Sequence, residues 1–162
     1  MKKIVQQEDP ILRKIAKPFE VKEISSTSTQ KIISEMFDSL TSQKDGVALA
    51  GPQIEHSRRI FVVAEHIFTE STVPPLVYIN PEIIKRSKDK KNMEEGCLSC
   101  RWWYGKTKRA SRVTVKAFDQ DGNQFEHDAT GLLAQIFQHE IDHLDGILFI
   151  DHAKSLKEID PE

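Results

Sequence analysis

The stretch His139-Glu140-Ile141-Asp142-His143 decides how this chain folds around its site. A helix repeats about every 3.6 residues, so His139 and His143 project from one face and Glu140 lies about 100° round from His139. Apolar residues flank the stretch at three- and four-residue spacing, which predicts an amphipathic or largely buried helix: Leu132, Leu133, Ile136, Phe137, Ile141 and Leu144. H-E-x-x-H on such a helix indicates zinc-type hydrolytic chemistry, against the simpler interpretation of two surface or core histidines.

Capping residues are expected at both ends of this helix. Thr130 or Asp128 is expected to cap its start, and Gly146 stands where a helix terminus favours a left-handed residue. Asp142 has two open interpretations: it orients a ligand histidine, or it pairs with a basic residue at the surface.

The remaining pattern predicts one α+β domain over residues 1–162, with antiparallel strands packed around the central helix that carries the motif. A second helix is expected from Thr29 to about Ser42. Strands are expected at 59–64, 76–79 and 113–118, with a hairpin turn at Asp121-Gly122. The few residues after Asp151 leave room for only a short C-terminal helix.

Composition excludes several classes of protein. The 162 residues are 38% hydrophobic and 30% charged, with a net charge of −2, which argues against a general phosphate-binding surface. The basic run Lys85 to Lys91 is therefore expected to be a solvated loop. No apolar run has transmembrane length, and no secretory segment or long transit peptide is recognised, so neither a membrane nor a specific nucleic acid is expected as a partner.

The two cysteines, Cys97 and Cys100, fit a reducing, cytoplasmic compartment and do not support a disulfide framework. A hydrolytic metal site with an open position needs about three protein ligands, so one must come from outside the helix. A thiolate from Cys97 with the two imidazoles would complete such a set, and its softness suits zinc or ferrous iron.

Around Cys97 the sequence resembles a known family. E-G-C-L-S at 95–99, followed by Q-H-E-I-D-H-L-D-G at 138–146, resembles the motifs of peptide deformylases. The stretch G-V-A-L-A-G-P-Q at 46–53 resembles the family's G-x-G-x-A-A-x-Q motif, and D-P-I-L-R at 9–13 and I-N-P at 79–81 resemble two further segments. The likeness covers nearly the whole chain and keeps the family's motif order.

The resemblance implies that Cys97, His139 and His143 bind one divalent metal ion. It favours Fe²⁺ in the cell, with Zn²⁺, Ni²⁺ or Co²⁺ as occupants after purification. Such a metal lowers the pKa of bound water from about 15.7 towards about 7, which makes a nucleophile available. Glu140 matches the family's catalytic carboxylate and would accept that water's proton, then pass it to the departing amine.

The resemblance assigns Gln53 and the backbone N–H of Leu98 to the oxyanion that develops on the formyl oxygen. It also implies that the substrate lies against Gly46, Val47, Ala48, Gly96, Leu132 and Ile136. Trp102, Trp103 and Tyr104 follow the ligand cysteine and are expected to form a wall of the substrate cleft, with core packing as the alternative.

Three positions depart from the family pattern. Ala48 replaces the second glycine of the motif, so its methyl group is expected to narrow the cleft or restrict the backbone. Gly51 replaces the second alanine and is expected to loosen the next position. Cys100 creates a C-x-x-C pair, which could indicate a zinc knuckle or a redox dithiol. We favour instead oxidation of Cys97 and Cys100 to a disulfide as a hazard to the metal site.

These features predict a metal-dependent hydrolase that removes the formyl group from the N-formylmethionine of nascent polypeptides. Two other functions stay open: an amidase with altered substrate preference, and a catalytically silent paralogue that binds formyl-peptides. Family members that dock on the ribosome do so through a basic C-terminal extension, which this chain does not resemble. Any ribosome contact is therefore expected to be transient.

Overall fold

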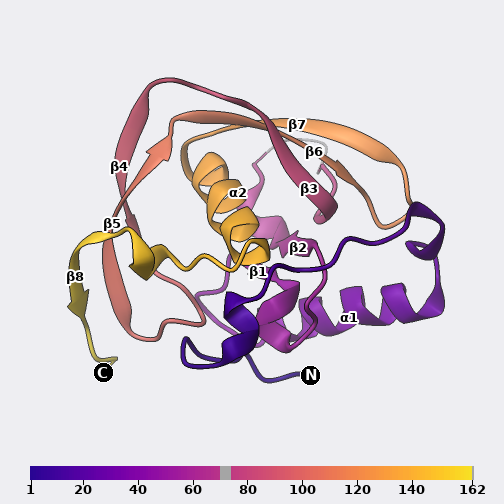
Figure 1. The fold of residues 1–162 in the computed structure, drawn as a ribbon, viewed down its shortest axis with the longest axis horizontal. Helices are drawn as coiled ribbons and strands as arrows, with labels where there is room; N and C mark the ends of the chain where they lie inside the picture. The colour runs from indigo at the N-terminus through magenta and orange to yellow at the C-terminus, as the bar shows by residue number, and fades with distance from the viewer. Residues whose placement is uncertain (70–73, 162) are drawn as a thin grey trace.

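The computed structural model of the chain describes residues 1–69 and 74–161, and two helices and two sheets organise them (Figure 1). Helix α2, Gly131–Leu144, lies in the middle of the ribbon with strands around it. This arrangement confirms the predicted α+β fold with a central helix. Helix α1, Thr27–Thr41, starts two residues before its predicted position because Ser26 caps it by accepting a hydrogen bond from the Thr29 N–H. Within the described ranges no helix has both the length and the apolarity needed to cross a membrane.

The larger sheet has the order β1-β2-β3-β6-β7, and every neighbouring pair is antiparallel. Its strands are β1 Ala48–Ala50, β2 Ile60–Val63, β3 Val77–Arg86, β6 Arg112–Phe118 and β7 Gln124–Thr130. The smaller sheet has the order β4-β5-β8, formed by Lys90–Glu95, Trp103–Ala110 and Lys154–Glu158. Short 3₁₀ helices connect these elements: η1 Pro10–Arg13, η2 Val21–Glu23, η3 Gly51–Ile54, η4 Glu65–Ile67 and η5 Phe149–Asp151.

The larger sheet is covered on both faces at β2. Successive side chains of a strand point to opposite faces, so Phe61 and Val63 of β2 join the core cluster under α2, while Ile60 and Val62 join the cluster under α1. Phe137 of α2 packs against Phe61, with the two ring centres 5.8 Å apart. This packing against the sheet positions α2 so that residues of its motif line the cavity.

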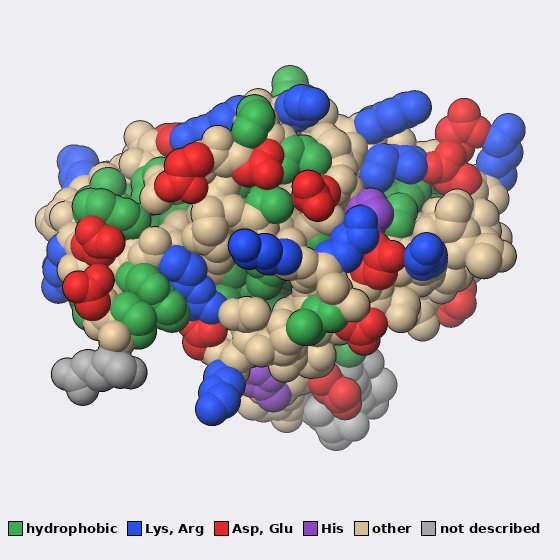
Figure 2. Space-filling model, turned by 90° about the horizontal axis from the view of Figure 1, so that it is seen from below, with side chains coloured by type: hydrophobic (Ala, Val, Ile, Leu, Met, Phe, Trp, Pro, Cys, Tyr) green, Lys and Arg blue, Asp and Glu red, His purple; other side chains and the backbone are tan. Residues whose placement is uncertain are grey.

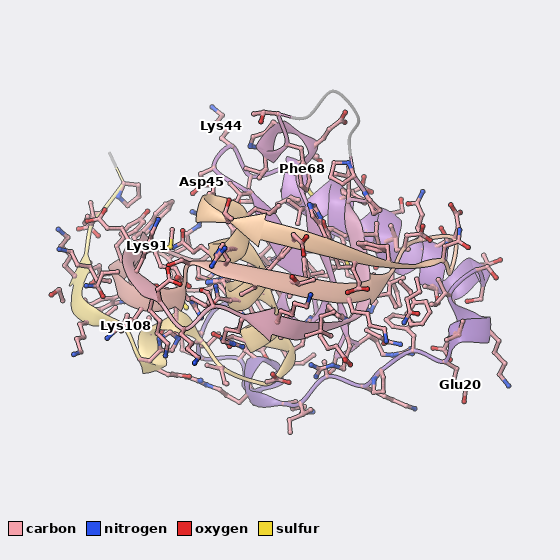
Figure 3. The ribbon with its side chains drawn as sticks, turned by 90° about the horizontal axis from the view of Figure 1, so that it is seen from above. Glu20, Lys44, Asp45, Phe68, Lys91 and Lys108 are labelled. Carbon is pink, nitrogen blue, oxygen red and sulfur yellow. The ribbon has the colours of Figure 1, made fainter. Side chains whose placement is uncertain are left out.

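Several predictions about local structure were wrong. Lys85 and Arg86 end β3, and Lys90 and Lys91 begin β4, so most of the supposed loop is strand. Lysine on an exposed outer strand prevents unwanted pairing with other sheets, so a basic run does not exclude a strand. Figure 3 shows Lys91 and Lys108 at the same end of the molecule, on the paired strands β4 and β5. The chain also ends in the strand β8 where a short helix was expected.

The ends of α2 were predicted in part. Thr130 occupies the N-cap position, but its side chain makes no capping hydrogen bond. Asp128 belongs to β7, and its carboxylate accepts a hydrogen bond from the Thr114 hydroxyl instead. Gly146 has φ +76 and follows the helix as predicted, and Gly122 has φ +85 in the predicted hairpin turn.

Candidate metal centre and active site

Three side chains from two elements converge at one end of a cavity. α2 supplies His139 and His143, and the turn after β4 supplies Cys97. One ligand atom from each residue lies within 4.8 Å of the others, and Cys97 Sγ is 3.3 Å from His143 Nε2. Thiolate and imidazole at this spacing fit a transition metal with one position left for another ligand.

Glu140 stands beside these three residues inside the cavity. Its side chain is 2% exposed, and burial raises its pKa to about 7. Its Oε2 atom has no hydrogen-bond partner in the described part of the chain. A buried carboxylate oxygen without a partner is costly unless a ligand or water binds it, so this atom supports the fit of a metal-assisted site.

Glu95 holds His139 in place, a role that the sequence analysis missed although Glu95 lies inside the quoted E-G-C-L-S motif. Glu95 Oε1 is 2.5 Å from His139 Nδ1, which leaves only Nε2 of that ring free to bind a metal. Burial opposes ionisation, but hydrogen bonds from His139 and Arg109 hold the pKa of Glu95 well below its usual value. Glu95 is therefore an anion placed to orient the His139 ring and to polarise it.

Arg109 stabilises that buried anion and connects it to α2. Its Nη2 atom is 2.5 Å from Glu95 Oε1, and its Nη1 atom is 2.6 Å from Asp142 Oδ2. Both interpretations of Asp142 hold in part, because it pairs with a basic residue and through that residue supports the partner of His139. No sequence pattern joined Glu95 to Arg109, whose contact depends on the pairing of β4 with β5.

Gln53 points its amide nitrogen at the ligand cysteine. Its Oε1 atom accepts the Ala50 N–H at 2.9 Å, so Nε2 must face the other way, 3.7 Å from Cys97 Sγ and 3.0 Å from the Ser99 hydroxyl. The N–H of Leu98 makes no hydrogen bond within the described residues, and Leu98 also lines the cavity. Two donors are thus available next to the metal ligands.

The cavity has a volume of about 360 Å³. The predicted substrate residues Val47, Ala48, Gly96, Leu132 and Ile136 all line it, together with the aromatic residues of 102–104. Gly46 is not among the described lining residues. A Cβ there would lie 2.9 Å from Leu40 Cδ1, so Gly46 serves the packing of the turn against α1.

The departures from the family motif have different structural settings. Ala48 is 8% exposed, belongs to the core cluster under α2 and lines the cavity. A Cβ at Gly51 would lie 2.8 Å from the carbonyl oxygen of His56 and 3.0 Å from that of Arg58, so Gly51 allows a close backbone approach and does not loosen the segment. Cys100 is fully buried among Leu12, Leu148 and Phe149, outside the metal-ligand group.

Known proteins resemble this chain in sequence and in fold. The family model for polypeptide deformylase matches residues 1–158. A peptide deformylase of Pseudomonas aeruginosa is 40% identical over 154 residues, covering 95% of this chain and 88% of that protein. The crystal structure of a peptide deformylase from Legionella pneumophila superposes with a TM-score of 0.84 at 42% identity, covering 96% of this chain and 87% of that one.

A crystal structure of a peptide deformylase from Acinetobacter baumannii with Met-Ala-Ser bound has a TM-score of 0.83 at 33% identity, covering 94% of this chain and 98% of that chain. The likeness in sequence and in structure extends over nearly the whole chain. The chain belongs to the polypeptide deformylase family of metal-dependent hydrolases.

Proposed function

We propose that this chain removes the formyl group from the N-formylmethionine of nascent polypeptides, with residues 1–162 as one catalytic domain. The observation that carries the proposal is the convergence of Cys97, His139 and His143 within 4.8 Å beside the unpartnered buried oxygen of Glu140. A metal held by three residues next to a free carboxylate is suited to hydrolysis of an amide. The family to which the chain belongs supports the choice of a formamide.

Glu140 is the group that moves protons. A pKa near 7 means that its carboxylate can take a proton from the attacking water and return it at neutral pH. Water adds to the formyl carbon, the bond from that carbon to nitrogen breaks, and Glu140 protonates the nitrogen as it departs. The products are formate and a free amino terminus.

Gln53 and Leu98 stabilise the charge that develops during attack. The Gln53 amide is already oriented by Ala50, so no reorganisation is needed when the formyl oxygen becomes negative. Loss of one such donor typically raises the barrier by about 2.7–4 kcal/mol. The Leu98 N–H would supply the second hydrogen bond.

Cys97, His139 and His143 would hold one divalent metal ion, which supplies an acidified water and polarises the formyl oxygen when bound. We propose Fe²⁺ as the native ion because a thiolate with two imidazoles suits it as well as Zn²⁺, and the family resemblance favours iron. Zn²⁺, Ni²⁺ and Co²⁺ are expected to occupy the same ligands after purification. Metal analysis of protein purified without oxygen tests this assignment.

The substrate is proposed to be an extended peptide whose formylated end enters the cavity. Val47, Ala48, Leu132 and Ile136 present apolar surface there, which fits a methionine side chain. The A. baumannii relative binds Met-Ala-Ser, the product expected from a formylated tripeptide. We place the reaction in the cytoplasm, because both cysteines are free thiols.

We propose no specific nucleic-acid or membrane partner, and at most a transient contact with the ribosome. In Figure 2, basic and acidic side chains are interspersed over the visible face, so no field of one sign covers it. This mixture agrees with the net charge of −2.

The decisive experiment measures formate release from formyl-Met-Ala-Ser by anaerobically purified, iron-loaded protein. Glu140→Ala should lower turnover by about 10²–10⁴-fold with the metal content retained, whereas Cys97→Ser should lower both. Glu126→Ala, which removes an exposed carboxylate on β7, is the matched control and should resemble the wild type. Equal turnover of Glu140→Ala and wild type would remove the mechanism, and full metal occupancy without turnover would favour a silent paralogue.

A further inference from the structure

The cavity has two walls at its mouth, and a pair of charged side chains joins them. One wall is the segment 43–48, which runs into β1, and the other is the segment 97–104, which runs from the ligand cysteine into β5. Asp45 belongs to the first wall, Arg101 and Trp102 to the second, and all three line the cavity. Figure 3 shows Asp45 next to Lys44.

Arg101 binds Asp45 through both ends of its guanidinium. Nη1 lies 2.5 Å from Asp45 Oδ2, and Nη2 lies 3.0 Å from Asp45 Oδ1. Nη2 is also 2.9 Å from Gln43 Oε1, so the arginine makes all of these contacts with one wall. The planar fork of arginine fixes the relative orientation of the two groups that it joins, which a single lysine contact would not do.

The guanidinium also covers an aromatic ring of its own wall. The Arg101 Cζ atom lies 4.4 Å from the centre of the Trp102 ring, a cation–π distance. The Arg101 side chain is 18% exposed, whereas that of Asp45 is 56% exposed. The bridge therefore contacts Trp102 and is partly open to solvent.

Gln6 also makes hydrogen bonds to the second wall, so this wall has contacts besides the bridge. The backbone N–H of Arg101 donates to Gln6 Oε1 at 3.2 Å, and Gln6 Nε2 donates to the Leu98 carbonyl at 3.0 Å. Arg101 is thus attached at its backbone to the segment that carries Leu98 and at its side chain to the segment that leads into β1.

We propose that the Arg101–Asp45 bridge sets the spacing of the cleft walls for the peptide residues that follow formyl-methionine, and so selects substrates that extend beyond it. The inference rests on the proposed function. Asp45 directly precedes 46–48, and Trp102 follows Arg101, so the bridge acts on both walls at the entrance. Glu140 lies deeper, 2% exposed, and the proposed function places the formyl group beside it. Arg101 and Asp45 are positioning residues.

The experiment compares a long and a short substrate. For wild type and Arg101→Ala, kcat and KM are measured with formyl-Met-Ala-Ser and with N-formylmethionine amide. The ratio of kcat/KM for the long over the short substrate should fall about fivefold in the variant, chiefly through KM of the long substrate, as expected for one ion pair near the surface.

Two further variants separate this role from a general loss of structure. The exchange of both charges, Asp45→Arg with Arg101→Asp, should recover most of the ratio that either single change loses. Arg58→Ala is the matched control, because Arg58 pairs with Glu23 and lies 4.0 Å over the Phe19 ring, away from the cavity lining. Arg58→Ala should keep the wild-type ratio.

Two results would overturn the inference: an unchanged ratio in Arg101→Ala, or an equal loss for both substrates without recovery in the exchanged pair. Calorimetric binding of Met-Ala-Ser compared with methionine amide tests the bridge without turnover, and the same fivefold change is expected. If the wild type binds Met-Ala-Ser yet releases no formate, the proposed function fails, and the binding ratio still decides the role of the bridge.

Discussion

Two arginine–carboxylate pairs stand at opposite depths of one cleft. Glu95 lines its inner part beside His139 and pairs with Arg109, and the side chains of Arg109 and Glu95 are 6% and 3% exposed. Arg101 and Asp45 lie at its mouth, with side chains 18% and 56% exposed. The contacts are alike in chemistry and length, 2.5 Å at the shortest in each, so the surroundings must account for any difference in what they do.

The difference teaches that depth decides the role of such a pair. At the mouth, water and salt screen the charges, and an exposed pair contributes about 0–1 kcal/mol to stability. At the inner end, each charge depends on the other for the solvation that water no longer supplies. The inner pair therefore supports the fold and the metal ligand, whereas the outer pair can affect substrate binding with little effect on stability.

The largest effect should come from Arg109→Ala. Removal of one partner leaves Glu95 as an uncompensated buried charge, which typically costs about 3–5 kcal/mol of the free energy of unfolding. Urea denaturation of the metal-free proteins measures it. Arg101→Ala is the comparison, and a loss of similar size for both variants would show that depth is not the deciding factor.

A smaller effect is expected on metal affinity. Glu95→Gln keeps the shape of the side chain but removes the anion that orients His139, so affinity for Zn²⁺ should fall about 10–100-fold. Competition with a chelating indicator measures the affinity. Asp45→Asn is the matched change at the mouth and should leave metal affinity as in the wild type; a fall there would contradict the assignment of separate roles.

Smaller still is the expected effect of the outer pair on stability. Asp45→Ala should lower the free energy of unfolding by no more than about 1 kcal/mol, because Asp45 is exposed and Arg101 can turn to water. The double variant with Arg101→Ala gives the coupling between the two residues. A coupling of several kcal/mol would mean that water is excluded from the Arg101–Asp45 pair as much as from the Arg109–Glu95 pair.

The smallest effect is a dependence on salt. In about 1 M NaCl the screening length falls to about 3 Å, so the preference of wild type for formyl-Met-Ala-Ser over N-formylmethionine amide should decrease towards that of Arg101→Ala. The metal affinity set by Glu95 should not follow the same course. A preference that is independent of salt in wild type would argue that Trp102 acts without the charged bridge.

The sequence predicted best what is encoded within a few residues. The spacing of His139 and His143 on one helical face, and the motif around Cys97, were enough to predict that three side chains able to bind a metal lie together. Short segments rich in Val, Ile and Phe predicted β2 and β6 nearly to their ends. Such signals survive in the fold because they follow from the periods of helix and strand.

The sequence could not predict contacts that depend on how distant strands pair. Glu95 reaches Arg109 only because β4 lies antiparallel to β5, and Asp45 reaches Arg101 only because two loops meet at the cleft. β4 itself was missed because its exposed lysines resemble a solvated loop, and β8 because five exposed residues carry no apolar pattern. Charged side chains pair with residues that are distant in sequence, so no local sequence pattern identifies their partners.

Gly51 limits which substitutions this segment can accept. The backbone oxygens of His56 and Arg58 already occupy the space beside its Cα, so an alanine, which the family motif has at this place, would require the turn at 55–58 to move. Ala48 carries no such condition, since a change to glycine there removes atoms from the cavity wall. The two departures from the family motif therefore differ in what they require. Ala48 can be changed to glycine alone, whereas a change of Gly51 to alanine depends on a movement of the neighbouring turn.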